Sequence, residues 1–149
     1  MSPKAGPIGA PSKSIAAVTK GLGGKQLTEF GMLAEAGAVG FTDDGLPVSD
    51  SQVMRRALSY AKTFDLLISQ HAEDLSLSGC GCMAEGEVAT RLGLDGIPSV
   101  SEVITVERDI RLVELTGGRY HVAHISTAAA VNCVRKAKDR GLQVTCEAA

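Results

Sequence analysis

Short apolar runs alternate with stretches of helical periodicity along most of the chain. Five of these runs have the length and composition of buried strands, at residues 15–18, 38–42, 66–70, 120–125 and 144–147. Between them, apolar residues recur three and four positions apart, as they do on the buried face of a helix. Because strands that are separated by helices must run parallel, the sequence predicts a parallel α/β sheet with right-handed crossovers.

Polar residues in front of the helical stretches indicate where the helices begin. Ser49 with Gln52, and Ser99 with Glu102, have the spacing of a capping box, and Ser126 is placed to cap the last helix. The residues expected to face the core lie at helical spacing: Leu27, Phe30 and Ala34, then Val53, Met54, Ala57, Leu58 and Ala61, then Val103, Val106, Ile110 and Val113, then Ala130, Val131, Val134 and Ala137.

Residues 72–98 interrupt this alternation with an irregular stretch that holds only a short helical piece near 85–92. Two architectures remain open: an open doubly wound sheet, and part of a (β/α)8 barrel. A complete eight-stranded barrel typically needs about 250 residues. The chain has 149 residues, so it has room for only part of such a barrel.

The composition argues against two classes of binding partner, nucleic acids and membranes. A formal charge of −2 and an aromatic content of 3% without tryptophan offer no basic or stacking surface to nucleic acid. No apolar run approaches the 18 or so residues of a membrane span. We therefore expect neither a nucleic-acid partner nor a membrane partner. Four scattered cysteines and no signal peptide favour a reducing, cytoplasmic location.

Both ends of the chain suggest a piece of a longer protein. Residues 1–13 hold three of the five prolines and no apolar period, and we expect them to be a flexible leader. The sequence stops directly after the predicted strand 144–147, with nothing to cover it. An open sheet exposes its edge strands, so we expect instability or self-association.

Ionisable side chains lie at or just after the carboxyl ends of three of the predicted strands. Asp43 and Asp44 follow the strand 38–42, His71 follows the strand 66–70, and His124 lies near the end of the strand 120–125. Since the carboxyl ends of parallel strands form the rim where α/β folds bind ligands, we expect these side chains to converge. One acid and two imidazoles suit Zn²⁺ or a similar divalent ion. The plainer alternatives are an Asp-Asp-Gly turn and hydrogen-bonded structural histidines.

The strand 120–125 also carries His121. Side chains three positions apart leave opposite faces of a strand, so only one of the two histidines can face the lumen. His124 is nearer to the functional end and shares its face with Tyr120 and Val122. We therefore predict that His124 faces the lumen and that His121 faces the helix layer.

Other motifs offer weaker signals. Residues 20–25 (KGLGGK) look like a phosphate loop, but Gln26 stands where that motif needs Ser or Thr, which favours a plain strand-to-helix turn. The string CGC at 80–82 lacks a second cysteine pair at zinc-finger spacing. Glu73 and Asp74 are either acceptors that orient a metal-bound histidine or solvated loop charges.

Several strings resemble dihydroorotase of the long bacterial type, within the amidohydrolase superfamily. They include FTDDG at 41–45, HAED at 71–74, EGE at 85–87, GIP at 96–98, ERD at 107–109, HVAHIST at 121–127 and VTCE at 144–147. They stand in the family's order, with His71 27 positions after Asp44 and His124 53 positions after His71. The resemblance covers residues 14–149.

The resemblance implies a (β/α)8 barrel with a zinc centre at the strand ends. Residues 14–149 would then form an incomplete barrel of about five βα units, from the third strand to the seventh. Asp44 resembles the carboxylate that bridges or binds the metals from the fourth strand, and His71 and His124 resemble the metal-binding histidines of the fifth and sixth strands. We therefore expect Asp44, His71 and His124 to be metal ligands in part of a site that holds two Zn²⁺ ions when complete.

The family's His-x-His pair and its proton-shuttling aspartate have no counterpart in these strands, and that aspartate is expected beyond residue 149. No catalytic residue is therefore assigned within the chain, and the substrate-binding residues are unknown. The implied reaction is the reversible cyclisation of N-carbamoyl-L-aspartate to L-dihydroorotate, with loss of water, in pyrimidine biosynthesis. We expect the chain alone to be inactive.

Two alternatives stay open. One is another cyclic amidohydrolase, either allantoinase or dihydropyrimidinase. The other is a metal-free homologue that supports aspartate carbamoyltransferase as a structural partner. The implied partners are accordingly the small-molecule substrate, a second copy in a homodimer, or aspartate carbamoyltransferase.

Overall fold

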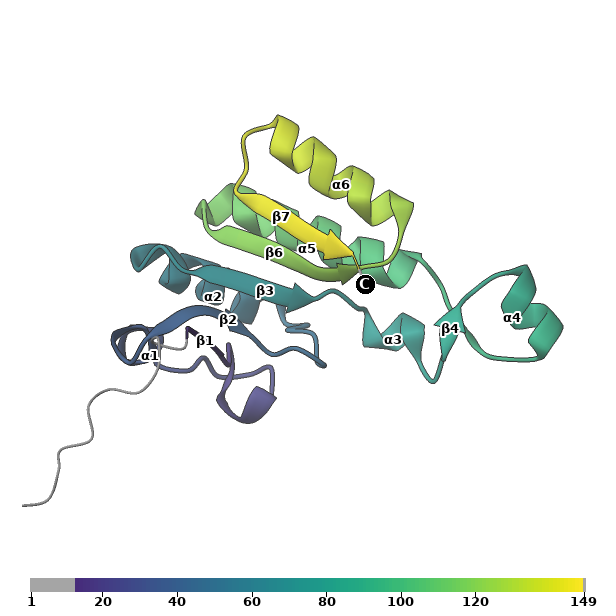
Figure 1. Ribbon diagram of the computed structural model, residues 1–149, viewed down its shortest axis with the longest axis horizontal. Coiled ribbons are helices and arrows are strands. Elements are labelled where there is room, and N and C mark those ends of the chain that lie inside the picture. Colours follow the sequence, from purple (N-terminus) through teal and green to yellow (C-terminus); the bar gives the residue numbers. More distant parts are fainter. Residues whose placement is uncertain (1–12, 149) are drawn as a thin grey trace, which may run out of the picture.

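The computed structural model describes residues 13–148, so the predicted leader lies outside the described residues except for Lys13. The main sheet has five parallel strands, which agree with the predicted runs to within two residues at each end. Figure 1 shows them in their spatial order: β1 (Ser14–Ala16), β2 (Ala38–Thr42), β3 (Leu67–His71), β6 (Arg119–Ile125) and β7 (Val144–Ala148).

Helices connect the strands of the main sheet. They are α1 (Phe30–Glu35) before β2, α2 (Ser51–Thr63) before β3, α5 (Val100–Thr116) before β6 and α6 (Ala128–Asp139) before β7, with a short 3-10 turn η1 (Lys20–Leu22) after β1. All the residues predicted to face the core on α2 are buried. Within residues 13–148, no helix combines the length and the hydropathy that crossing a bilayer requires.

The stretch 72–98 has more structure than the sequence predicts. It contains α3 (Leu75–Ser78), β4 (Met83–Ala84), α4 (Glu87–Leu92) and β5 (Gly96–Ile97). The strands β4 and β5 pair with each other in parallel and form a separate small sheet. Strands of two residues are too short to leave a periodic signal, which explains why the pattern misses them.

One face of the main sheet carries the hydrophobic core. A row of residues in register across four strands packs there with α2, α5 and α6: Phe41, Ile68, Tyr120 and Val144. The adjacent row points to the opposite face and takes no part in the core: Thr42, Ser69, His121 and Thr145. In Figure 1, α2 and α5 lie together behind the sheet.

This arrangement decides between the two architectures. A doubly wound sheet has helices on both faces and a reversal in its strand order, whereas a barrel has helices on the outer face and strands in sequential order. The strands here follow one another in chain order, interrupted only by the small sheet. The fold is therefore a partial (β/α)8 barrel, and the open face corresponds to the lumen.

The helix caps differ from the predicted ones. Asp50 caps α2, since its Oδ1 accepts the N–H groups of Gln52 at 2.8 Å and Val53 at 2.9 Å. The predicted capping box of Ser49 with Gln52 is therefore wrong. Thr127 caps α6 by accepting the Ala130 N–H at 3.2 Å, one position after the predicted Ser126.

The predicted capping box at the start of α5 is also absent. Ser99 makes no side-chain capping bond. The Glu102 carboxylate instead accepts the N–H groups of Ser126 at 2.7 Å and Thr127 at 2.9 Å. Glu102 thus holds the loop after β6 against the start of α5, on the side where the strands end.

Candidate metal centre

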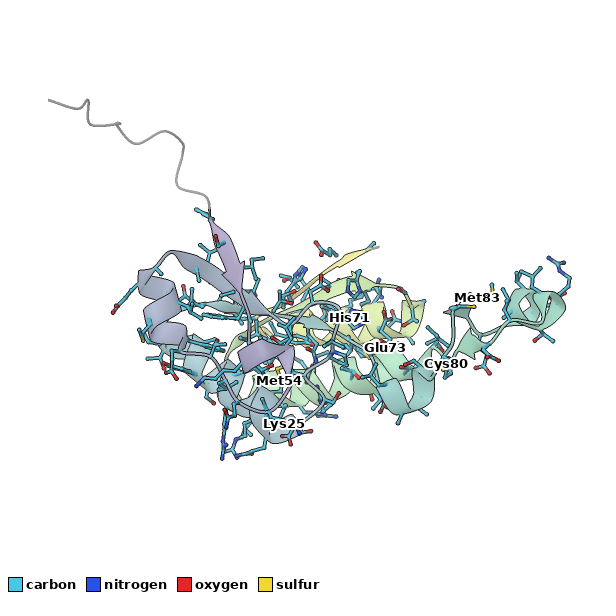
Figure 2. All side chains as sticks on the ribbon, turned by 90° about the horizontal axis from the view of Figure 1, so that it is seen from below. Lys25, Met54, His71, Glu73, Cys80 and Met83 are labelled. Carbon is cyan, nitrogen blue, oxygen red and sulfur yellow. The ribbon has the colours of Figure 1, made fainter. Side chains whose placement is uncertain are left out.

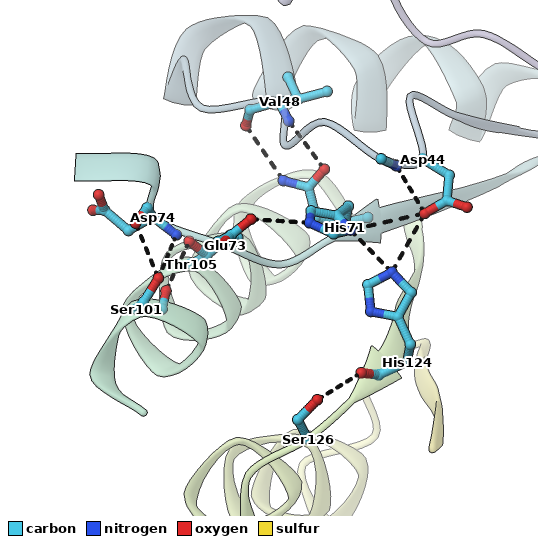
Figure 3. A network of polar contacts seen from close by, with 11 residues as sticks. Asp44, Val48, His71, Glu73, Asp74, Ser101, Thr105, His124 and Ser126 are labelled. Carbon is cyan, nitrogen blue, oxygen red and sulfur yellow. Dashed lines mark hydrogen bonds and ion pairs between the residues drawn. The ribbon is translucent and has the colours of Figure 1, made fainter. Parts of the chain in front are cut away.

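Asp44, His71 and His124 meet at the carboxyl ends of β2, β3 and β6 (Figure 3). His71 Nδ1 lies 3.0 Å from His124 Nε2. Asp44 Oδ1 lies 3.3 Å from His124 Nε2 and 3.8 Å from His71 Nδ1. The three atoms all lie within 4.8 Å of one another and form a group that could hold a metal ion. The structure thus brings together the side chains that the sequence predicts to converge.

The two aspartates after β2 have different surroundings. Asp43 is buried and accepts the backbone N–H of Thr19 at 3.0 Å as well as the Thr19 hydroxyl. Asp44 lies in a turn, where its Oδ1 also accepts the N–H of Gly45 at 3.0 Å, and its side chain is 61% exposed. Gly45 has a φ of 90°, which favours glycine. The turn and the convergence with the histidines are therefore both present.

The faces of β6 are the reverse of the predicted ones. Tyr120 and Val122 are fully buried against the helices, and the Tyr120 hydroxyl donates to Asp109 of α5 at 2.9 Å. His121 lies on the opposite, open face of the sheet. The prediction that His124 shares a lumen-facing side with Tyr120 and Val122, while His121 faces the helix layer, is therefore wrong.

His124 reaches the cluster because the strand is irregular at this point. Its φ is 38°, outside the range of a regular strand. The pairing of β6 with β7 shifts register between Val122 and Ile125. The irregularity resets the alternation of side chains, so His124 turns towards His71 on the open side of the sheet. A strict alternation argument misses such a break.

Glu73 orients the ring of His71. Its Oε2 lies 3.1 Å from His71 Nε2, and both side chains are 24% exposed. Because a carboxylate only accepts hydrogen bonds, His71 donates to Glu73 from Nε2, and in the tautomer that carries its single proton there Nδ1 presents a lone pair to the other two side chains. Of the two interpretations of this acid, the orienting contact is the one that its geometry favours.

Asp74 has a different role from Glu73. Its carboxylate accepts the hydroxyl of Ser76 at 2.6 Å and the N–H of Ser76 at 2.9 Å, which caps α3. These bonds, with the hydroxyl as the larger influence, hold the pKa of Asp74 below its usual value. Asp74 therefore stabilises a local turn and does not contact the histidine.

A pocket of about 320 Å³ lies beside the two histidines of the cluster. Its walls come from the ends of β3 and β6, the small sheet and the start of α5, and they include His71, Glu73, Met83, Ile97, Glu102 and His124. Figure 2 shows Cys80 and Met83 on an arm that extends from the body of the molecule beyond His71 and Glu73. The irregular stretch therefore builds one wall of the site, a role that its sequence pattern does not reveal.

Comparisons with known proteins agree with the resemblance seen in the sequence. A family model described as "Dihydro-orotase-like" matches residues 10–130. The dihydroorotase of Anaeromyxobacter dehalogenans (strain 2CP-C) is 58% identical over 133 residues, which are 89% of this chain and 31% of that protein. The dihydroorotase of Syntrophotalea carbinolica is 56% identical over 135 residues, 91% of this chain and 32% of that protein. The chain thus spans about a third of the length of these relatives.

Solved structures show the same fold. The L-hydantoinase (dihydropyrimidinase) from Arthrobacter aurescens matches with a TM-score of 0.65 and 20% identity, over 90% of this chain and 31% of that one. The dihydropyrimidinase from Brevibacillus agri NCHU1002 matches with a TM-score of 0.61 and 21% identity, over 78% of this chain and 27% of that one. With its fold and most of its length matched in this way, the chain belongs to the dihydro-orotase-like family.

Proposed function

We propose that this chain supplies part of the metal site of a zinc-dependent cyclic amidohydrolase of the dihydroorotase type. Its metal ligands are Asp44, His71 and His124. The observation that carries the proposal is the convergence of one carboxylate oxygen and two imidazole nitrogens, from three strands, within 4.8 Å.

The donor set suits zinc. Zinc binds imidazole nitrogen and carboxylate oxygen at about 2.0–2.2 Å, so neighbouring ligand atoms of a tetrahedral site lie about 3.3–3.6 Å apart. The three separations here are 3.0, 3.3 and 3.8 Å. The contact of His71 with Glu73 matches the carboxylate–histidine–metal arrangement that is common around zinc. The family resemblance implies two zinc ions in a complete site, of which these ligands form part.

A bound zinc ion provides a hydroxide near neutral pH and polarises an amide carbonyl. The chain's own residues hold the ligands in place: Glu73 orients the ring of His71, the Gly45 N–H binds Asp44, and the irregularity in β6 directs His124. The adjacent pocket has room for a small molecule. The substrate we propose is L-dihydroorotate, or N-carbamoyl-L-aspartate in the reverse direction, in cytoplasmic pyrimidine biosynthesis.

The comparisons favour dihydroorotase over the other cyclic amidohydrolases. Relatives that carry this name are 52–58% identical to the chain, whereas the hydantoinases and dihydropyrimidinases among the solved structures are 20–24% identical. The presence of all three expected ligands favours a catalytic protein over a metal-free partner of aspartate carbamoyltransferase.

Zinc binding by the purified chain tests the ligand assignment. We expect the chain to bind Zn²⁺ in competition with a chromogenic chelator, and His124→Ala to weaken binding by at least about tenfold, as loss of a ligand requires. His121→Ala is the matched control, since His121 lies on the same strand outside the cluster. Equal affinities of the two variants would contradict the assignment.

The proposed substrate requires a second experiment, because we expect the chain alone to be inactive. Residues 14–149 replace the corresponding third of the Anaeromyxobacter dehalogenans dihydroorotase, which is 58% identical. The chimera should hydrolyse L-dihydroorotate, and His71→Ala should abolish its activity. A folded, zinc-loaded chimera that hydrolyses dihydrouracil or allantoin but not L-dihydroorotate would overturn the substrate assignment.

A further inference from the structure

A buried polar network lies on the helix side of the sheet, on the face opposite the candidate metal centre. Its centre is Asp109 of α5, which has no exposed surface. Asp109 accepts the Tyr120 hydroxyl at 2.9 Å and the Arg108 guanidinium at 2.7 and 2.8 Å. A buried carboxylate is costly to place in a core, and the pair of Arg108 with Asp109 therefore calls for an explanation beyond packing.

Arg108 extends the network to the loop that carries Asp44. Its Nη1 donates to the carbonyl of Ser49 at 2.6 Å, and its Nη2 donates to the carbonyl of Val48 at 2.8 Å. Gln70 of β3 holds the same segment, because its Nε2 donates to the Val48 carbonyl at 3.3 Å and its Oε1 accepts the Val48 N–H at 3.2 Å. Figure 3 shows the two bonds to Val48.

Each branch of the network ends on a segment that carries one of the candidate ligands. One branch reaches the loop that begins at Asp44, and one reaches Gln70, the residue before His71. The third reaches Tyr120, on the strand that carries His124. A single connected set of hydrogen bonds therefore touches all three segments that build the metal centre.

We propose that Arg108 and Asp109 position the metal ligands by fixing the distance between the Asp44 loop and the two histidine strands. The side chain of Asp44 is 61% exposed, so packing restrains it little. Contacts from outside its own turn are therefore required to fix its position. The inference rests on the proposed function, because it assigns positioning residues to the proposed metal site. The competing explanation is that the network only stabilises the fold.

Arg108→Lys is the most direct test of this positioning role. Lysine keeps the charge but lacks the planar fork that binds two carbonyls and a carboxylate together. Arg119→Lys is the matched control, because Arg119 also donates from Nη1 to a backbone carbonyl, that of Asp65 at 2.7 Å. That bond lies at the start of β6, at the end of the sheet away from the metal centre.

A second pair of variants covers the case in which Arg108→Lys fails to fold. Tyr120→Phe removes only the hydroxyl that donates to Asp109. Tyr60→Phe removes a hydroxyl that accepts the N–H of Gly31 at 3.3 Å, outside the network. Each variant is compared with its control at the same folded fraction, measured by circular dichroism.

Two measurements decide the proposal. The first is the affinity for Co²⁺, followed through its visible absorption, which reports ligand geometry. The second is amide hydrogen exchange of residues 43–49 without metal. Arg108→Lys should weaken Co²⁺ binding by about tenfold or more, the range found when groups that orient metal ligands are removed, and should speed exchange selectively in 43–49. Tyr120→Phe should act in the same direction.

The proposal is overturned if the network variants match their controls in Co²⁺ affinity and in exchange, or if exchange rises evenly over the whole chain. Failure of the unsubstituted chain to bind Co²⁺ or Zn²⁺ would instead refute the proposed function. Hydrogen exchange of residues 43–49 would then still decide whether Arg108 and Asp109 hold the Asp44 loop in place.

Discussion

His71 has a contact on each of its two ring nitrogens, and the two contacts have different consequences. The contact of Nε2 with Glu73, at 3.1 Å, selects the tautomer. The contact of Nδ1 with His124, at 3.0 Å, places the lone pair inside the cluster. A single acid beside one ring therefore determines which nitrogen is available to a metal ion.

Glu73→Gln tests this selection of the tautomer. The amide keeps the shape of the side chain but can donate as well as accept, so it no longer enforces the donor role of His71 Nε2. We expect Zn²⁺ affinity to fall by about tenfold to a hundredfold. Asp74→Asn is the matched control, because Asp74 caps α3 and does not contact the ring. An equal loss in both variants would show that the charge of the loop, rather than the ring orientation, governs affinity.

The sequence could predict the members of the cluster because each lies at or just after the carboxyl end of a predicted strand, and parallel strands end at a common rim. It could not predict how His124 enters the cluster. The φ of His124 is 38°, which breaks the regular alternation of side chains on which the prediction relies. The orienting contact of Glu73 is one of two interpretations that the sequence leaves open, since a loop acid three positions after a predicted strand carries no signal of its direction.

At the level of elements, the start of α2 shows how spacing alone misplaces a cap. Ser49 and Asp50 are both residue types that cap helices well. The carbonyl of Ser49 is held by Arg108 at 2.6 Å, and Asp50 is the residue whose side chain accepts the first free N–H groups of the helix. The choice depends on a tertiary contact from α5, which a local pattern does not contain.

Asp50→Ala should therefore destabilise the chain by about 1 kcal/mol, the usual cost of losing a cap. Ser49→Ala should change the free energy of unfolding by less than about 0.5 kcal/mol, as exposed substitutions usually do. Urea denaturation of the two variants checks both values. A larger loss for Ser49→Ala than for Asp50→Ala would restore the capping box that the sequence predicts.

Helix α5 contains a titratable group whose environment makes stability depend on pH. Burial raises the pKa of Asp109 from 3.8 to about 6, although Arg108, Tyr120 and Gln70 act in the opposite direction. The folded state therefore favours the protonated acid. This contribution to stability is complete below about pH 4 and is lost as the pH rises through about 6.

Asp109→Asn should remove this dependence, because the amide does not titrate. Between pH 4 and pH 6, the free energy of unfolding of the unsubstituted chain should fall relative to that of the variant, by up to about 3 kcal/mol. Urea denaturation at several pH values measures the difference. A difference that stays constant across this range would mean that Asp109 remains ionised throughout, held by Arg108.

At the scale of the whole molecule, the two faces of the sheet have different roles. The face covered by α2, α5 and α6 holds the core, and the open face and its rim carry the ionisable side chains. The sequence predicted the strands and their parallel order. It could not predict which face the helices cover, because the alternation of Tyr120 and His121 distinguishes two faces without saying which of them meets the helices.

Metal binding should stabilise the whole chain, because the three ligands come from segments up to 80 positions apart and converge only in the folded state. At a Zn²⁺ concentration about 100 times the Kd, the free energy of unfolding should rise by about 2.7 kcal/mol, because the ion binds the folded state and not the unfolded one. Thermal denaturation with Zn²⁺, and with Mg²⁺ as a control ion that prefers oxygen ligands, measures the gain. Equal effects of the two ions would argue against a site with two imidazole ligands.

The strands β3 and β6 pair directly along five residues, although the stretch 72–98 intervenes between them in the chain. Two hydrogen bonds join the ends of that stretch. The Ser101 hydroxyl accepts the N–H of Asp74 and donates to the carbonyl of Asp74, each at 3.0 Å. All three candidate ligands lie outside it. Residues 75–97 can therefore be replaced as a unit. A different segment that is joined to the chain between Asp74 and Ser101 would change the shape of the pocket and leave the sheet and the ligand side chains in place.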